Sequence, residues 1–154
     1  MFQPRRRVNI ISNQSVEMIL HTLRSITDEA KSVSQIRNRN LLFFGTIEAP
    51  EFVIYNMPVE MAKNFLIEIK GRIIKNDDSV QIDLDVRPVR FIRVFAMLWL
   101  AFAFLFFILS FFLSHQPMPT LVAAAMCVFG ILFFHICFSI ISNKAIKNLY
   151  ELLT

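Results

Sequence analysis

Two long stretches without a charged side chain, residues 94–114 and 121–141, limit what this chain can fold into more than any other feature. At a rise of about 1.5 Å per residue, a helix over either stretch is about 31 Å long, which matches the roughly 30 Å hydrocarbon core of a bilayer. Only one ionisable residue, His135, interrupts the second stretch. Each stretch is therefore predicted to be a membrane-spanning helix.

The overall composition agrees with this prediction. Of the 154 residues, 55% are hydrophobic and only 18% are charged, whereas about a quarter are charged in ordinary soluble domains. Two Cys are too few for a disulfide scaffold. The net charge of +4 and the isoelectric point near 9.4 do not indicate a nucleic-acid partner, because the basic residues are not concentrated on one helix or face.

The short loop at residues 115–120 contains two prolines and no Lys or Arg, so the two spans are predicted to form an antiparallel hairpin. Five basic side chains flank the open end of this hairpin: Arg87, Arg90, Arg93, Lys144 and Lys147. They are predicted to contact lipid headgroups, and the positive-inside rule places both termini in the cytosol. The chain is thus expected to be a two-span protein of the inner membrane.

Residues 1–90 are predicted to form a cytosolic α+β domain. Apolar residues at spacings of three and four indicate a helix over about 14–33. Alternating segments then predict a four-stranded antiparallel meander whose buried face the helix covers. The predicted strands are 41–48, 52–55, 64–75 and 80–87.

The segments near the two ends of the sequence have predictions of their own. The basic run at residues 5–7 is either a frayed, solvated terminus or a contact with anionic lipid. After the hairpin at 91–141, residues 142–154 are predicted to form a short amphipathic helix, which is expected to dock on the sheet because an isolated helix of this length is marginal in water.

A weak internal repeat lies in the predicted strands. The pattern Phe-x-Gly-x-Ile at 43–47 returns as Ile-x-Gly-x-Ile at 69–73. A sheet domain with this strand, followed by a two-helix hairpin and a short amphipathic helix, resembles small bacterial two-span membrane proteins of unassigned function. The resemblance covers the layout of residues 40–154, implies a bacterial inner membrane and assigns no functional residue.

Small residues recur at helical spacing along both predicted spans. They are predicted to form a seam where the two helices pack together, or else a contact between copies in a homo-oligomer. The two Cys belong to this seam and are interpreted as packing residues rather than nucleophiles or ligands. The seam residues are Ala96, Ala103 and Ser110 in the first span and Ala123, Cys127, Gly130 and Cys137 in the second.

His135, Ser139 and Ser142 form a polar strip in the second span, at spacings of four and seven. An ionisable group inside a span is a functional hypothesis by default, and in an oligomer this strip would line a water-filled path or sense protons. The structural alternative is a neutral histidine that bonds within its own hairpin.

The sequence predicts no catalytic residue, cofactor or metal site. Asp83 and Asp85 share one face of a strand, where they are either a metal-binding pair or solvated partners of Lys70 and Arg72. Because the nucleophilic, phosphate-binding and zinc motifs are absent from the sequence, an enzyme is not expected.

Two functional hypotheses remain. The first is a non-enzymatic, membrane-anchored interaction or sensing module that binds an unknown cytosolic protein or small ligand. Its binding site would be the wet sheet face or a free sheet edge at residues 52–55. The second is a membrane effector that oligomerises through the hairpin and forms a pore or depolarises the bilayer, as a toxin or defence protein does.

Overall fold

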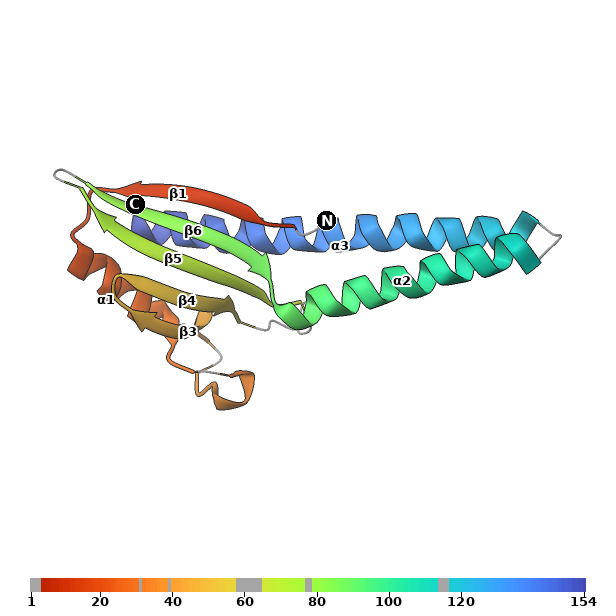
Figure 1. Ribbon diagram of the computed structural model, residues 1–154. Helices are drawn as coiled ribbons and strands as arrows, with labels where there is room; N and C mark the ends of the chain where they lie inside the picture. The colour runs from red at the N-terminus through yellow and green to blue at the C-terminus, as the bar shows by residue number, and fades with distance from the viewer. Residues whose placement is uncertain (1–3, 31, 39, 58–64, 77–78, 114–116) are drawn as a thin grey trace.

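The computed structural model describes residues 4–30, 32–38, 40–57, 65–76, 79–113 and 117–154, and within them the chain is α+β. A sheet forms one end of the molecule, and two long helices project beyond it as a hairpin (Figure 1). In chain order the elements are β1 (Arg6–Ser12), α1 (Val16–Ile26), β2 (Thr27–Asp28), the 3-10 helix η1 (Val33–Gln35), β3 (Phe43–Glu48), β4 (Glu51–Asn56), β5 (Ile67–Lys75), β6 (Val80–Pro88), α2 (Arg90–Leu113) and α3 (Pro117–Leu153).

The described strands form one mixed sheet of six strands in the order β1-β6-β5-β4-β3-β2. β2 pairs in parallel with β3, and the other neighbouring strands are antiparallel. The four predicted strands are present as β3 to β6, adjacent to one another and in chain order. The predicted four-stranded sheet is nevertheless wrong in strand number, because β1 and β2 extend it at its two edges.

β1 forms where the sequence suggests an irregular basic terminus. Val8 and Ile10 pack into the core, while Arg7 and Asn9 are exposed on the opposite face, so this segment has the two-residue alternation of a strand. The run of arginines at its start obscures that alternation in the sequence. Residues 6–12 are therefore part of the sheet.

Helix α1 is shorter than the predicted helix over 14–33. Its N-cap is Ser15, whose hydroxyl accepts a hydrogen bond from the backbone nitrogen of Met18 at 3.2 Å. Thr27 already has an extended backbone, with φ −117° and ψ 128°, and begins β2. The β-branched Thr27 is buried at the edge of the sheet, and this strand pairing ends the helix at Ile26.

The core lies between one face of the sheet, here called the inner face, and two helices, α1 and the C-terminal part of α3 (Figure 1). Ile19 and Leu23 on α1 are fully buried, as are Leu149 and Leu153 on α3. Each such side chain contributes about 1.5–3 kcal/mol through burial. The buried side chains of the inner face are Ile10, Phe43, Ile47, Phe52, Ile54, Ile67, Ile69, Ile73, Val80, Ile82, Leu84 and Val86.

The two glycines of the sequence repeat lie on either side of β4. Gly45 on β3 pairs with Ile54, has φ +155°, and would bring a Cβ within 2.1 Å of the carbonyl oxygen of Val53. Gly71 on β5 pairs with Phe52, whose ring would lie 1.9 Å from a Cβ at that position. Both glycines therefore leave room for β4, one for its backbone and the other for its aromatic ring.

The predicted second span and the predicted C-terminal helix form one uninterrupted helix, α3, of 37 residues. Pro117 starts this helix, in the first turn where a proline is well tolerated. Residues 114–116, in the predicted loop at 115–120 and at the end of the first predicted span, lie outside the described part. The first half of α3 packs against α2, and its last turns cover the sheet (Figure 1).

Candidate functional site

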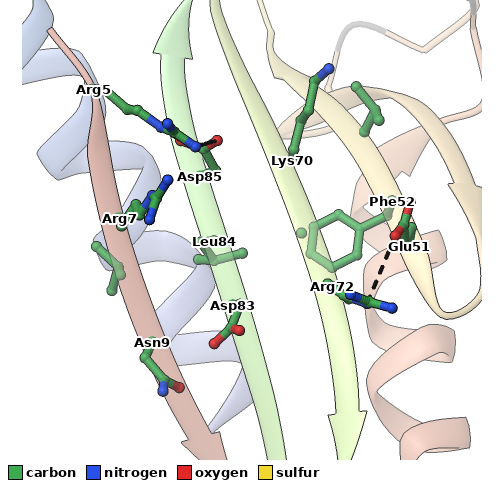
Figure 2. A pocket seen from close by; sticks show the side chains of 13 residues that line it. Arg5, Arg7, Asn9, Glu51, Phe52, Lys70, Arg72, Asp83, Leu84 and Asp85 are labelled. Atoms are coloured by element: carbon green, nitrogen blue, oxygen red, sulfur yellow. Dashed lines mark hydrogen bonds and ion pairs between the residues drawn. The ribbon is translucent and has the colours of Figure 1, made fainter.

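The face of the sheet that points away from α1 and α3, here called the outer face, is lined with charged side chains (Figure 2). A shallow depression of about 760 Å³ lies over β1, β6, β5 and β4. Acidic and basic groups alternate across it, so this surface suits a polar ligand or a protein surface. Its charged and polar lining residues are Arg5, Arg7, Asn9, Glu51, Lys70, Arg72, Asp83 and Asp85.

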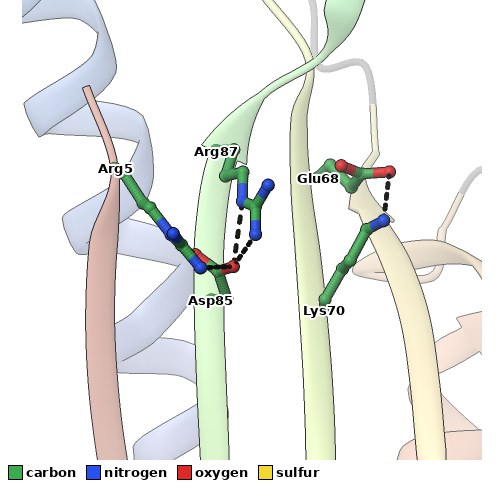
Figure 3. Close-up of polar contacts among 5 residues, drawn as sticks. All are labelled: Arg5, Glu68, Lys70, Asp85 and Arg87. Carbon is green, nitrogen blue, oxygen red and sulfur yellow. Dashed lines mark hydrogen bonds and ion pairs between the residues drawn. The ribbon is translucent and has the colours of Figure 1, made fainter. Parts of the chain in front are cut away.

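Asp85 is held by two arginines at one side of this depression (Figure 3). Arg5 donates to both carboxylate oxygens, from Nε at 2.7 Å and from Nη2 at 2.6 Å, and Arg87 donates to Oδ2 from Nε at 2.9 Å. The hydrogen bonds from Arg5 are the main reason why the pKa of Asp85 lies well below its ordinary value. Partial burial opposes this shift and Arg87 adds to it, so Asp85 remains charged.

The sheet register places Lys70 opposite Asp85 and Arg72 opposite Asp83, which confirms the predicted cross-strand neighbours. The contacts themselves differ from that prediction. Lys70 is 3.8 Å from Glu68, Arg72 is 3.8 Å from Glu51, and Gln81 donates to Asp83 at 2.9 Å. Arg5, just before β1, binds Asp85 from the side of β6 opposite to β5, because β1 lies beside β6.

The far end of the outer face is covered by the chain between β2 and β3. Phe44 and Tyr55 stack with ring centroids 5.2 Å apart, and Ala30 packs with them in a small apolar cluster. Tyr55 donates to Glu68 at 3.3 Å, and burial, with the charge of Glu68, raises the pKa of its hydroxyl. The open part of the outer face is therefore the part over β1, β6 and β5.

The predicted free edge at residues 52–55 is wrong. β4 lies inside the sheet between β3 and β5 and pairs on both sides. β1 pairs with β6 only, so its other side is an open edge of the sheet (Figure 1). The alternation of Val8 and Ile10 with Arg7 and Asn9 is the sequence signal that identifies this strand.

No family model matches the chain, and no curated protein or solved structure is significantly similar to it. Among the described residues, no three His, Cys, Asp or Glu side chains are grouped so that they could hold a metal ion.

The proposed seam residues are among the less exposed residues of α2 and α3. A Cβ at Gly130 would lie 3.0 Å from Nε1 of Trp99 on α2, which shows how close the helices come at that level. Most other side chains of the hairpin are exposed. Ala103, Ser110 and Ala123 are buried, and Ala96, Cys127, Gly130 and Cys137 are half-buried.

The three residues of the predicted polar strip differ in their exposure. His135 and Ser139 are exposed on α3, whereas Ser142 is only 1% exposed and lies against the sheet core. The Ser142 hydroxyl donates to the backbone oxygen of Ser139 at 3.2 Å. A water-filled path along α3 would therefore involve His135 and Ser139 without Ser142.

The five basic residues flanking the hairpin lie at two levels. Arg90 is exposed at the start of α2, and Arg87 and Arg93 nearby are half-buried. Because Gly130 is level with Trp99, Arg93 is level with about residue 136, and Lys144 lies roughly 12 Å farther from the hairpin tip. Lys147 is farther still and pairs with Glu151 at 3.6 Å. The three arginines thus lie near the start of the hairpin, and the two lysines lie farther from its tip.

Replacing Asp85 by Asn is expected to destabilise the sheet by about 1 kcal/mol, because the partly exposed Arg5 and Arg87 lose their shared carboxylate. The lowered pKa of Asp85 means that its contribution is fully present above the unfolded value near 4 and is lost progressively as the pH falls from there through the lower pKa of the folded state. Urea unfolding at pH 7 and pH 3 measures both effects. In the control, Asp83→Asn, the hydrogen bond from Gln81 is the one side-chain contact at risk among the described residues; equal losses in the two variants would contradict this prediction.

Proposed function

We propose that the protein is a two-span membrane protein, because α2 and α3 present large apolar side chains to the outside. Both helices are long and apolar enough to cross a membrane, and only 11% of the most apolar window of each is buried. A core helix of a soluble protein would be mostly buried. Exposed apolar surface of this extent needs lipid or another apolar partner. This exposed hairpin is the observation that carries the proposal.

The proposed orientation places the sheet and both termini on the cytosolic side of a bacterial inner membrane. Arg87, Arg90 and Arg93 lie at the end of the hairpin that joins the sheet, where the positive-inside rule expects basic residues. The short connection at the other end of the hairpin has no Lys or Arg. This distribution of charge supports insertion with the sheet inside the cell.

The proposed role is that of a membrane-anchored interaction or sensing module. α1 and α3 cover the inner face, so the outer face and the β1 edge remain for a partner. The outer face carries no grouping that suggests catalysis, and its alternating charges suit recognition of a polar surface. A non-enzymatic function is thus the proposal that these residues support best.

Cysteine labelling tests the membrane topology. In a chain with Cys127 and Cys137 replaced by alanine, new cysteines are placed at Met118, near the hairpin tip, and at Glu17 on α1, both of which are exposed. A membrane-impermeant maleimide should label Met118→Cys in intact spheroplasts and Glu17→Cys only after lysis. The reverse pattern would overturn the orientation, and release of the protein by alkaline carbonate would overturn the membrane assignment.

The same cells distinguish the module from an effector. One observation favours the effector: the exposed His135 and Ser139 on α3 place polar groups on the surface of the proposed span. A potential-sensitive dye should show no depolarisation on expression of the interaction module. Rapid depolarisation, weakened in His135→Leu at a matched membrane level, would support an oligomerising effector instead.

A further inference from the structure

We propose that β1 binds an extended segment of a partner protein in which acidic and apolar side chains alternate, so that the segment becomes a seventh strand. This inference rests on the proposed interaction role and names the site and the chemistry of the partner. β1 has seven residues and pairs only with β6 (Figure 1). Roughly half of its backbone N–H and C=O groups therefore point to the open side, where a further strand can bond to them.

The positive charge of Arg7 at this edge would select acidic side chains on the outer face of the added strand. Arg5 donates to Asp85 and Arg6 donates to Asn143, but among the described residues the guanidinium of Arg7 has no side-chain hydrogen bond or ion pair. Arg7 is exposed and lies in the same row as Asp85 and Lys70 (Figure 2). An acidic side chain on an added strand would lie next to Arg7, at the spacing of a cross-strand pair.

Ile146 and Tyr150 on α3 form an apolar surface beneath the β1 edge, here called the apolar shelf. This shelf would select the side chains of the added strand that point inward. The hydrogen bond from Arg6 shows that Asn143 is on the β1 side of α3. Ile146 and Tyr150 follow three and seven residues later, so they lie on that same side of the helix. Tyr150 is 54% exposed and Ile146 is half-buried. Inward side chains of an added strand would cover this shelf, which favours apolar residues there.

We assign the partner to a different chain, because the direction of the strands disfavours antiparallel pairing of two copies in one membrane. β1 runs along the axis of the helical hairpin (Figure 1). If two copies paired through β1 in antiparallel fashion, their hairpins would point in opposite directions, which one bilayer does not allow. A segment of another protein has no such constraint.

Peptide binding to the full-length protein in zwitterionic nanodiscs tests the inference. The probe is a capped, fluorescein-labelled nine-residue peptide of alternating Glu and Val. Its affinity should fall at least about tenfold in Arg7→Glu, and also in Tyr150→Ala. Arg72→Glu is the matched control, because it makes the same charge change on the outer face but away from the edge; it should change the affinity less than threefold.

Two further peptides separate strand addition from simple attraction. The same peptide with N-methylated valines should lose at least about tenfold in affinity, because main-chain hydrogen bonds are blocked. A Lys/Val peptide should not bind. Equal effects of Arg7→Glu and Arg72→Glu, indifference to N-methylation, or no binding of the Glu/Val peptide would each overturn the inference. Failure of binding by a protein that remains membrane-bound leaves the membrane anchoring intact.

The second-copy alternative has its own test. In the chain without native cysteines, Asn9→Cys places a thiol on β1 at the exposed edge strand. No disulfide-linked dimer should form in membranes under mild oxidation. A dimer through this position, absent for a cysteine at Arg72, would assign the edge to a second copy and overturn the proposed partner.

Discussion

Replacing Gly45 by valine should unfold the sheet domain. A Cβ at this position would lie 2.1 Å from the carbonyl oxygen of Val53 and 2.8 Å from the Cα of Ile54, and both of these are backbone atoms of β4. The φ of +155° is also one that residues with side chains rarely adopt. Because no rotamer change relieves either conflict, we expect a loss of about 3–5 kcal/mol, comparable with the whole stability of many small domains.

Far-UV circular dichroism and limited trypsin digestion of the full-length protein in mild detergent measure this loss. Gly130→Ala is the control, because its added Cβ meets movable side chains, that of Trp99 at 3.0 Å and that of Leu100 at 3.9 Å, and because alanine favours a helix. That variant should stay within about 1 kcal/mol of the wild type. A trypsin-resistant Gly45→Val protein with the normal strand signal would contradict the structure of β3 and β4.

Replacing Leu149 by alanine should cost about 3 kcal/mol, although this residue lies in the last turns of a helix that begins in the hairpin. Leu149 is fully buried in the core between α3 and the inner face. Its truncation leaves a cavity that the packed strands fill only in part. The protein should still sediment with membranes, because the hairpin residues are unchanged.

The neighbouring Tyr150 gives a matched control for this second prediction. It is 54% exposed, so Tyr150→Ala should change the free energy of unfolding by about 0.5 kcal/mol or less. Urea unfolding of the two variants in the same detergent makes the comparison. Equal losses, or a larger loss for Tyr150→Ala, would show that the last turns of α3 do not pack on the sheet as described.

The strands that are readable in the sequence are those with one uninterrupted buried face. In β6, the buried Val80, Ile82 and Leu84 alternate with polar residues, and the predicted and observed strands nearly coincide. β1 is not readable in the same way, because its arginines resemble a solvated terminus until Asp85 is placed beside them. The end of α1 is likewise set by the pairing of Thr27 with β3, a contact between distant segments.

The sequence predicts the candidate site only in part, because local alternation shows which residues share a face but not which strands are neighbours. Local alternation predicts that Asp83 and Asp85 share a face, and the register confirms their neighbours on β5. The free edge and the Arg5 contact depend on strand order, which alternation does not specify. Helical spacing likewise groups Ser142 with His135, but only the docking of α3 on the sheet buries Ser142.

The continuity of α3 has a consequence for how a partner meets this protein. A domain on a flexible linker can take many orientations, but here a single helix of 37 residues, about 55 Å long, leaves no joint between the helical hairpin and the sheet. In a bilayer, the rigid α3 would hold the strands of the sheet roughly along the membrane normal. A bound partner would then be held at a fixed height and a fixed tilt, and the freedom that remains is lateral drift and rotation about the membrane normal.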